Sequence, residues 1–202
     1  MSSAQSPREA DGGGLRFVVG LGNPGPRYAR TRHNVGFRLV DGLAGVQPWR
    51  NFQGLGEWRR CEGVFLGKPM TFMNESGRFV GAFARFHKIP PGRVLLCCDD
   101  VALPLGRLRL RPGGSAGGQK GMESVLHGLG TDAVPRLRIG VGPQPPGMDS
   151  AAFVLEPFGA DEEKALPAVL ETAVAAVRVA VAEGLEAAMN RFNVRPSGTE
   201  NA

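Results

Sequence analysis

The sequence predicts a single α/β domain, with a twisted mixed β-sheet flanked by helices on both faces. Short runs of β-branched and aromatic residues alternate with longer segments of helical periodicity, which is typical of a sheet covered by helices. Some of the links between these runs are short, which favours antiparallel pairing at those places. With 202 residues, 42% of them hydrophobic, the chain can bury one good core but not two large domains.

The first strand is expected at residues 17–19, where an apolar run ends in glycines and prolines. Residues 1–14 before it are rich in serine, glycine and charge and lack apolar periodicity, so we expect a disordered lead. A helical pattern follows at residues 34–43. Residues 46–60 contain both tryptophans and are compatible with either core or a lid.

The remaining elements continue the alternation. Further strands are expected at residues 64–65, 94–98, 108–111 and 137–141. Further helices are expected at residues 76–86, 118–129 and 160–189. A loose tail is expected from about Arg191, and we place the folded domain at residues 15–193 with residues 194–202 as the tail.

Composition narrows the partners and the compartment. The net charge is +5 and the isoelectric point about 9.6, with arginine dominating the cations, so a polyanionic partner is favoured over a membrane or an acidic protein. The three cysteines are unsuited to a disulfide framework, and no Cys or His pair has zinc-ligand spacing. The N-terminus does not resemble a signal peptide, and charges interrupt the apolar stretch at residues 165–189. We therefore expect a cytoplasmic protein without a metal.

Two glycine motifs are compatible with other functions. Gly20-x-Gly22-x-x-Gly25 has the spacing of a dinucleotide-binding fingerprint. However, Pro24 and Pro26 flank its last glycine and delay the helix that would bind pyrophosphate. The match is therefore weak, and we expect no cofactor.

The second motif, Gly113-x-Ser115-x-Gly117, lies between a strand and a helix, as the nucleophile of a serine hydrolase does. The only later histidine, His127, lies too close on the following helix to complete a triad. A glycine-rich turn that opens a helix is the simpler interpretation, and its backbone amides could hold a phosphate or a polar substrate group.

Among the three histidines, His33 has the most suggestive surroundings. It lies in a loop crowded with polar side chains beside a strand end, where functional residues often occur. From position alone, a local structural role near a helix N-terminus is equally compatible. We expect His87 and His127 to be helix-surface residues, with His87 at a helix end.

Several specific motifs occur in fixed order along the chain. They are GLGNPG at 20–25, Tyr28, TRHNVGF at 31–37, KPMTFMNESG at 68–77, DDVALPLG at 99–106, GGSAGG at 113–118 and RLRIGVG at 136–142. Together they resemble the bacterial-type peptidyl-tRNA hydrolase family from about Leu15 to Asn193. The resemblance implies hydrolysis of the ester that joins a nascent peptide to the terminal ribose of tRNA, which recycles tRNA from aborted translation.

The resemblance also implies the catalytic residues. His33 matches the family's general base, and Asp99 the carboxylate that orients it. Asn74 matches an amide that contacts substrate near the attacking water, and Asn23 the amide that reads the peptide side of the ester. From the residues alone, Asp99 could be a turn acid or cap, Asn23 a turn residue and Asn74 a helix cap.

Contacts to the acceptor stem and 3′ end of tRNA are implied as well. Tyr28, the single tyrosine, and Phe72 match positions that could stack on the terminal bases. Arg109, Arg111 and Arg138 match basic positions that face acceptor-stem phosphates, and the first two alternate with leucines, so they share one strand face. A core position for Phe72 and a solvated basic face for the arginines stay open.

One pair of residues departs from the family pattern. Many members have His-Asn after the glycine-rich turn, where this chain has Gln119-Lys120. Lysine only donates and carries charge, so it cannot accept a hydrogen bond from the catalytic water. We hypothesise that Lys120 binds the terminal phosphodiester or the substrate carbonyl and leaves catalysis intact.

A catalytically silent RNA-binding member of the same fold is the main alternative function. The presence of the complete catalytic set argues against it. A serine esterase that uses Ser115 is a further alternative, and it predicts that small esters without tRNA are good substrates. The preferred tRNA and peptide are not evident from the sequence, and a monomer is our default expectation.

Overall fold

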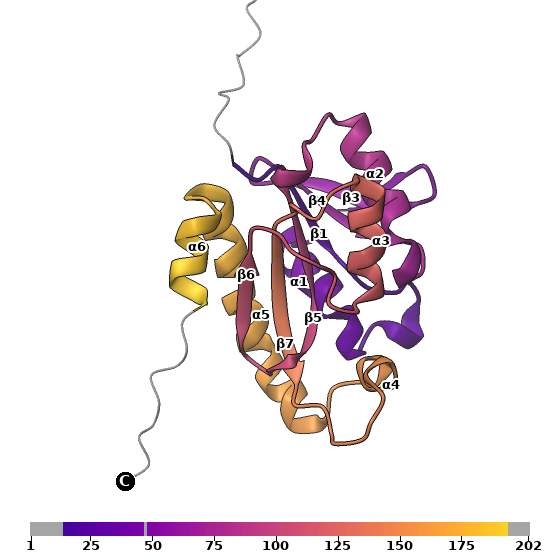
Figure 1. Ribbon diagram of the computed structural model, residues 1–202, viewed down its shortest axis with the longest axis vertical. Coiled ribbons are helices and arrows are strands. Elements are labelled where there is room, and N and C mark those ends of the chain that lie inside the picture. Colours follow the sequence, from indigo (N-terminus) through magenta and orange to yellow (C-terminus); the bar gives the residue numbers. More distant parts are fainter. Residues whose placement is uncertain (1–13, 47, 194–202) are drawn as a thin grey trace, which may run out of the picture.

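The computed structural model describes residues 14–46 and 48–193 (Figure 1). The predicted lead, apart from Gly14, and the predicted tail at 194–202 lie outside the described residues. Within them, one seven-stranded sheet has the order β2-β3-β4-β1-β5-β7-β6. Its strands are β1 (Phe17–Gly20), β2 (Arg50–Phe52), β3 (Gly56–Cys61), β4 (Val64–Pro69), β5 (Val94–Pro104), β6 (Leu108–Arg111) and β7 (Arg136–Gly142).

The centre of the sheet is parallel and both of its sides are antiparallel. Strand β1 pairs in parallel with β4 and β5, and β5 pairs in parallel with β7. On one side, β3 runs antiparallel to β4 and β2 to β3, and on the other side β6 runs antiparallel to β7. The predicted mixed sheet is therefore confirmed. Ligands of such sheets usually bind beyond the carboxyl ends of the parallel strands.

Helices cover both faces of the sheet, as the sequence predicts (Figure 1). One core lies between the sheet and α1 (Val35–Ala44), α5 (Ala160–Ala182) and α6 (Leu185–Phe192). The other core is rich in aromatic side chains and lies under α2 (Ser76–Phe86) and α3 (Lys120–Leu129). Each core is built from alternate residues of the same strands, because successive strand side chains point to opposite faces.

The strands differ from the predicted ones mainly in length and number. Strand β5 continues past Cys98 to Pro104, and it pairs again with β7 after a register shift. Residues 46–60 contain β2 and β3, which form an antiparallel hairpin, and Trp58 of β3 packs against the aromatic core. The short helix α4 (Ser150–Leu155) is not predicted, because six residues are too few to establish a helical period.

The single helix expected at residues 160–189 is wrong, since α5 and α6 are separate. Gly184, with φ of +97°, lies between them in a backbone conformation that favours glycine. The loose tail expected from Arg191 also begins too early, because α6 runs through Phe192. The Asn193 side chain then accepts from the Leu110 N–H at 2.7 Å and donates to the Leu110 carbonyl at 3.0 Å. An amide can make both bonds because it carries a donor and an acceptor.

Helix α5 is long and apolar enough to cross a membrane by length and composition. One such helix is weak evidence, because core helices pass the same test. Its buried side chains, among them Leu166, Ala173 and Val177, belong to the core beneath the sheet. We therefore interpret α5 as a helix that packs on the sheet through one face, with 33% of its apolar window buried.

Close packing of β1 against α1 explains two of the glycines. A Cβ on Gly20 would lie 2.1 Å from the Gly36 carbonyl oxygen, and one on Gly36 would lie 2.4 Å from the Cys97 carbonyl oxygen. Gly25, with φ of +103°, opens a 3-10 turn at Pro26–Tyr28 and not an α-helix. The glycines of the apparent dinucleotide motif therefore serve packing and turning, and the α-helical N-terminus of that fingerprint does not follow them.

Candidate active site

A cleft of about 480 Å³ lies beyond the carboxyl ends of the parallel strands. Its walls come from the loops after β1 and β4, from the second half of β5, from β7, from the glycine-rich loop and start of α3, and from α4. The predicted site residues that line it are Asn23, Tyr28, His33, Phe72, Asn74, Asp99, Lys120 and Arg138. Arg109 and Arg111 lie outside this lining.

The central contact of the cleft joins an imidazole to a carboxylate. His33 lies in the 3-10 turn Arg32–Asn34, and its Nδ1 is 2.9 Å from Oδ2 of Asp99 in β5. The side chains of His33 and Asp99 are 13% and 3% exposed. Because the carboxylate accepts, we assign the proton to Nδ1, which leaves Nε2 with a free lone pair. The imidazole is therefore oriented to take a proton with Nε2.

The second oxygen of Asp99 is also bonded. Gln119 donates from Nε2 to Asp99 Oδ1 at 3.3 Å. Gln119 is also the N-cap of α3, and its Oε1 accepts from the Met122 N–H at 2.5 Å. In the sequence, Gln119 stands out only as a departure from the family pattern, and its place at the start of a predicted helix is the signal for a capping role.

Asn23 is held from behind by several hydrogen bonds. Its Oδ1 accepts from the Met73 N–H at 2.8 Å, and its backbone exchanges two bonds of 2.9 Å with the side chain of Asn34. Asn23 is 7% exposed and lines the cleft. Since Oδ1 is engaged, Nδ2 is the donor that Asn23 can offer to a substrate. The sequence assigns no role to Asn34, and the structure shows that its buried side-chain amide holds the backbone of Asn23.

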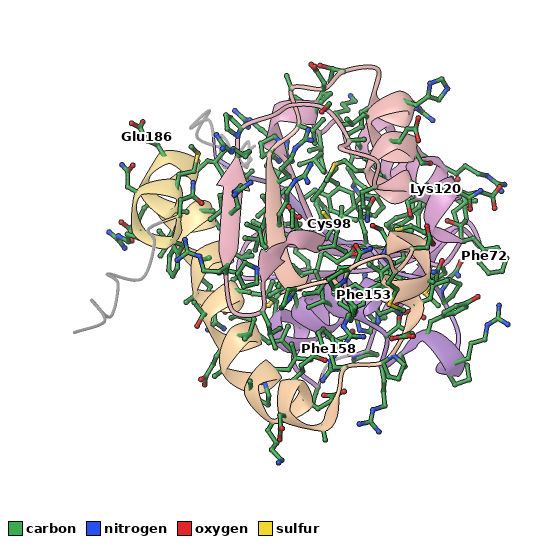
Figure 2. The ribbon with its side chains drawn as sticks, turned by 60° about the horizontal axis from the view of Figure 1, so that its bottom comes forward. Phe72, Cys98, Lys120, Phe153, Phe158 and Glu186 are labelled. Carbon is green, nitrogen blue, oxygen red and sulfur yellow. The ribbon has the colours of Figure 1, made fainter. Side chains whose placement is uncertain are left out.

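The loop after β4 presents two exposed side chains. Phe72 is 54% exposed, so the expectation that it could be a core residue is wrong. Asn74 is exposed in the 3-10 turn Met73–Glu75, and neither this turn nor α2 has a side-chain N-cap. The capping alternative for Asn74 is therefore also wrong. Figure 2 shows Phe72 and Lys120 on one side of the molecule, far from Glu186 on α6.

Basic side chains line and flank the cleft. Arg138 donates to Asp100 Oδ2 at 3.2 Å, which partly neutralises its charge. Arg109 and Arg111 are exposed on β6 and lie opposite Arg138 and Arg136 of β7, so they share a face as predicted. Lys120 is exposed at the first position of α3.

Arg136 is 1% exposed and has a structural role. Its guanidinium donates to the carbonyls of Val134, Ser115 and Asp132 at 2.8–3.2 Å, which holds the glycine-rich loop against β7. Ser115 takes part in this contact through its backbone carbonyl and not through its hydroxyl. Ser115 is exposed and lies outside the cleft lining, and His127 is exposed on α3, so the serine hydrolase alternative has no assembled triad.

Other nucleophiles and ligands are poorly placed. Burial raises the pKa of the Cys97 and Cys98 thiols well above their ordinary value, so both stay protonated. Among the described residues, no group of three or more His, Cys, Asp or Glu could hold a metal ion. The contact between His33 and Asp99 is an arrangement in this cleft that can activate a water molecule.

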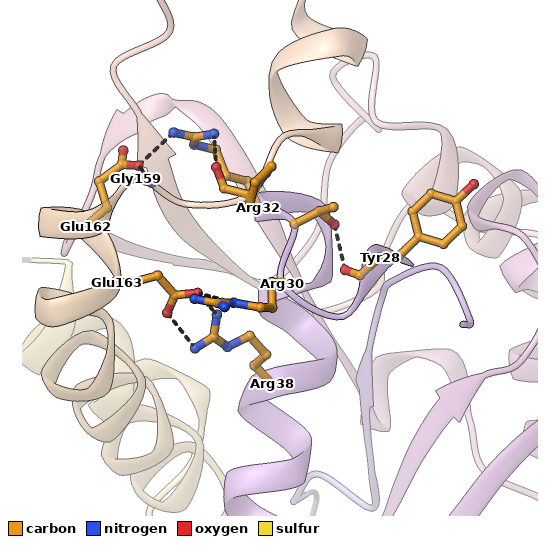
Figure 3. A network of polar contacts seen from close by, with 9 residues as sticks. Tyr28, Arg30, Arg32, Arg38, Gly159, Glu162 and Glu163 are labelled. Atoms are coloured by element: carbon orange, nitrogen blue, oxygen red, sulfur yellow. Dashed lines mark hydrogen bonds and ion pairs between the residues drawn. The ribbon is translucent and has the colours of Figure 1, made fainter. Parts of the chain in front are cut away.

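The turn that carries His33 is anchored to helices α4 and α5 (Figure 3). Arg32 is 7% exposed, and its Nη2 lies 2.6 Å from Glu162 Oε2 near the start of α5. Its guanidinium stacks 4.3 Å from the ring centre of Phe153 in α4. Arg38 of α1 holds Glu163 at 3.0 Å, and this hydrogen bond is the main cause of the lowered pKa of Glu163.

His87 lies at the end of a helix as expected, but it is half-buried and not exposed on the surface. It caps the end of α2, but its ring centre lies 4.2 Å from that of Phe83 and 4.5 Å from that of Phe65. Burial, together with the nearby charge of Arg16, lowers the pKa of His87 below its ordinary value of 6.5. His87 therefore lies at the end of α2 with its half-buried ring against the aromatic core.

Comparison with known proteins gives a consistent result. The sequence profile of the peptidyl-tRNA hydrolase family matches residues 17–200. A peptidyl-tRNA hydrolase of Elusimicrobium minutum is 50% identical over 186 residues, covering 89% of this chain and 99% of the relative. One from Symbiobacterium thermophilum is 52% identical over 186 residues, covering 88% and 98%.

Solved structures agree. A peptidyl-tRNA hydrolase crystallised in complex with N-propanol superposes with a TM-score of 0.83 at 32% identity, covering 94% of this chain and 100% of that one. The enzyme from Acinetobacter baumannii superposes with a TM-score of 0.81 at 33% identity, covering 91% and 97%. This chain belongs to the peptidyl-tRNA hydrolase family.

Proposed function

We propose that the cleft is the site at which this enzyme hydrolyses the ester between a peptide and tRNA. Family membership supports the activity, and the 2.9 Å bond between His33 and Asp99 in an open cleft supports the assignment of the site. An ester of this kind requires an activated water, stabilisation of a tetrahedral oxyanion and a grip on a polyanionic leaving group.

The reaction begins with proton transfer to His33. Nε2 takes a proton from water while the water oxygen attacks the ester carbonyl carbon, and the carbonyl electrons move to the carbonyl oxygen. Asp99 stabilises the imidazolium that forms. When the tetrahedral intermediate collapses, the bond to the ribose oxygen breaks and that oxygen takes the proton from Nε2. The products are a free peptide carboxyl group and a free ribose hydroxyl, and His33 returns to its neutral form.

The two asparagines supply neutral hydrogen-bonding groups. Asn23 lines the cleft, and its Nδ2 is the donor left for a substrate because Oδ1 accepts from the Met73 N–H. Asn74 is exposed on the facing loop and can contact the water or the developing oxyanion. One such preorganised donor is typically worth about 10²- to 10³-fold in rate.

The tRNA end would bind along the rim of the cleft. Tyr28 and Phe72 present aromatic rings on which terminal bases can stack. Lys120 and Arg138 line the cleft, and Arg109 and Arg111 extend the basic surface along β6. We also propose that residues 15–193 act as one domain, as a monomer, in the cytoplasm and not at a membrane.

The assignment is tested by the His33→Ala substitution. Purified protein is given N-acetylated aminoacyl-tRNA and release of the N-blocked amino acid is measured. Loss of the general base should lower kcat by about 10²- to 10⁴-fold. His127→Ala, which removes an exposed imidazole on α3, is the matched control and should leave the rate unchanged.

Two outcomes would overturn the proposal. A His33→Ala variant that keeps the wild-type rate would remove His33 as the base. Absence of release by the unmodified protein, together with retained tRNA binding, would favour the catalytically silent RNA-binding alternative.

A further inference from the structure

Gln119 connects the N-terminus of α3 to the carboxylate behind His33. Its Oε1 accepts from the Met122 N–H at 2.5 Å, and its Nε2 donates to Asp99 Oδ1 at 3.3 Å. Met73 Sδ lies 3.8 Å from the same Nε2. The side chain of Gln119 therefore caps helix α3 and also bonds Asp99 of the proposed catalytic pair.

The orientation of this amide is determined by its two partners. If the amide were flipped, Oε1 would face the negative oxygen of Asp99 and Nε2 would face the N–H of Met122. Both contacts would be repulsive, since they would place two acceptors or two donors together. The N-terminus of α3 thus selects the orientation in which Gln119 donates to Asp99.

Capping alone does not explain glutamine at this position. Helix N-caps are most often Ser, Thr, Asp or Asn, whose short side chains reach back to the first turn. Asp149, for example, caps α4 in this way. The longer side chain of Gln119 can bond both the helix and Asp99. Gly117 and Gly118, with φ of +61° and +81°, provide the turn that brings it there.

The need for this second bond follows from the burial of Asp99. The residue is 4% exposed, and a buried carboxylate oxygen without a donor is costly. Without Gln119, Oδ1 would lose this donor, and any rotation of the carboxyl group toward another donor would move Oδ2 away from His33 Nδ1. With both oxygens bonded, the carboxylate plane and hence the imidazole orientation are held.

We propose that Gln119 is a positioning residue that acts on His33 through Asp99. The proposal rests on the proposed function of the cleft. Gln119 does not exchange a proton with substrate or water in this scheme. It keeps Asp99 in the orientation that selects the Nδ1-protonated tautomer of His33.

The test uses Gln119→Ser in the full-length protein. Serine can still cap α3, but its hydroxyl is too short to reach Asp99. We expect kcat for N-acetylated aminoacyl-tRNA to fall about tenfold, as one lost hydrogen bond to a charged group would produce. KM and the thermal midpoint should stay close to the wild-type values. Gln119→Glu keeps the length and the cap but replaces the donor by an acceptor, so its kcat should fall further.

A spectroscopic measurement separates positioning from a general effect on folding. The chain has three histidines, so ¹⁵N-histidine labelling gives few imidazole signals. Wild-type His33 should show the Nδ1-protonated tautomer, and Gln119→Ser should show a mixture of tautomers. Glu123→Ala, which alters the exposed first turn of α3 away from Asp99, is the control and should change neither kcat nor the His33 signals.

Two results would overturn the inference. One is a Gln119→Ser variant with wild-type kcat. The other is a reduced kcat with wild-type His33 signals, because the loss would then arise without any change in the imidazole. The His33→Ala experiment separates this failure from failure of the proposed function, since it tests the base independently of Gln119.

Discussion

Individual side chains in the cleft are held to very different degrees. His33, Asp99 and Asn23 are partly or fully buried, and each is held by at least one hydrogen bond within the protein. Phe72 and Lys120 are exposed on the rim. The buried residues are fixed in place, as groups that take part in chemistry must be. The exposed residues on the rim can adjust to the end of a nucleic acid.

The role of Lys120 can be tested by Lys120→Asn. We expect KM to rise while kcat stays within about twofold, if the ammonium binds the terminal phosphodiester as we propose and does not act in the chemical step. The dependence of log affinity on log salt concentration should become less steep by about one unit, since one fewer counterion is released. The measurement is tRNA binding and turnover over a series of salt concentrations.

Lys164→Asn is the matched control for Lys120→Asn. Lys164 is an exposed lysine of α5 that pairs with Asp161, and it lies outside the cleft lining. Unchanged affinity and turnover in Lys120→Asn would indicate that Lys120 only points to solvent. Affinity of the unmodified protein that does not vary with salt would contradict the phosphate contacts altogether.

At the level of elements, the short turn carrying His33 depends on helices that follow much later in the chain. A 3-10 turn of three residues has little stability of its own. Arg32 within it is bonded to Glu162 and packed on Phe153, which places the start of α5 and α4 around the turn. Figure 3 shows this network beside the neighbouring contacts of Arg30 and Arg38 with Glu163.

Glu162→Ala should therefore destabilise the protein and disturb the site. We expect the free energy of unfolding to fall by about 1.5–3 kcal/mol, because a largely buried guanidinium loses a charged hydrogen-bond partner. kcat should fall as well, since the turn carries His33. The measurements are urea denaturation and turnover of N-acetylated aminoacyl-tRNA.

The matched control removes an exposed ion pair of the same kind. Glu62 and Arg178 lie 3.1 Å apart with side chains that are each 55% exposed. Glu62→Ala should cost less than about 1 kcal/mol. Equal losses in the two variants would contradict an anchoring role for Arg32 and Glu162.

Local pattern predicts elements well where one face is clearly buried. Strand β6 and helix α2 have the predicted bounds, since leucines alternate in the first and apolar residues recur at helical spacing in the second. The pattern fails for β2, whose first two residues are exposed, and for the α5–α6 boundary, where one glycine interrupts an otherwise continuous apolar stretch. Such short or uniform segments take their structure from their neighbours in space.

For the molecule as a whole, a half-buried titratable ring lies against the core under α2. His87 is surrounded by Phe65 of β4, Phe83 of α2 and Trp58 of β3, with the charge of Arg16 nearby. Both burial and Arg16 disfavour the protonated ring, so the pKa of His87 in the folded protein is lowered. Global stability should therefore depend on the protonation state of this residue.

The direction of this pH dependence follows from how many protons the folded and the unfolded protein bind. Below about pH 6.5 the unfolded chain protonates this histidine while the folded protein resists, so the unfolded state binds more protons and stability falls with pH. As the pH is lowered, this loss of stability begins near the pKa of His87 in the unfolded chain and stops once the pH is below its pKa in the folded protein. Above pH 7 the residue should make no pH-dependent contribution.

His87→Phe should remove this part of the acid sensitivity. We expect the difference in thermal midpoint between the variant and the wild type to grow in favour of the variant between about pH 7 and pH 5. His127→Gln controls for loss of an imidazole at an exposed position. A difference that is constant over this pH range would contradict the burial of His87 as a source of pH dependence.

Local sequence information was sufficient for the α/β class, for most strands and helices, and for the motifs that single out His33, Asp99, Asn23 and Asn74. Packing in three dimensions was needed to join His33 to Asp99 across 66 residues, and Asn193 to Leu110 across 83. It was also needed to bring the side chain of Gln119 within hydrogen-bond distance of Asp99 and the ring of His87 against the aromatic core. The physical reason is that periodicity and turn chemistry report each residue's near neighbours, whereas these contacts depend on how distant elements pack around two shared cores.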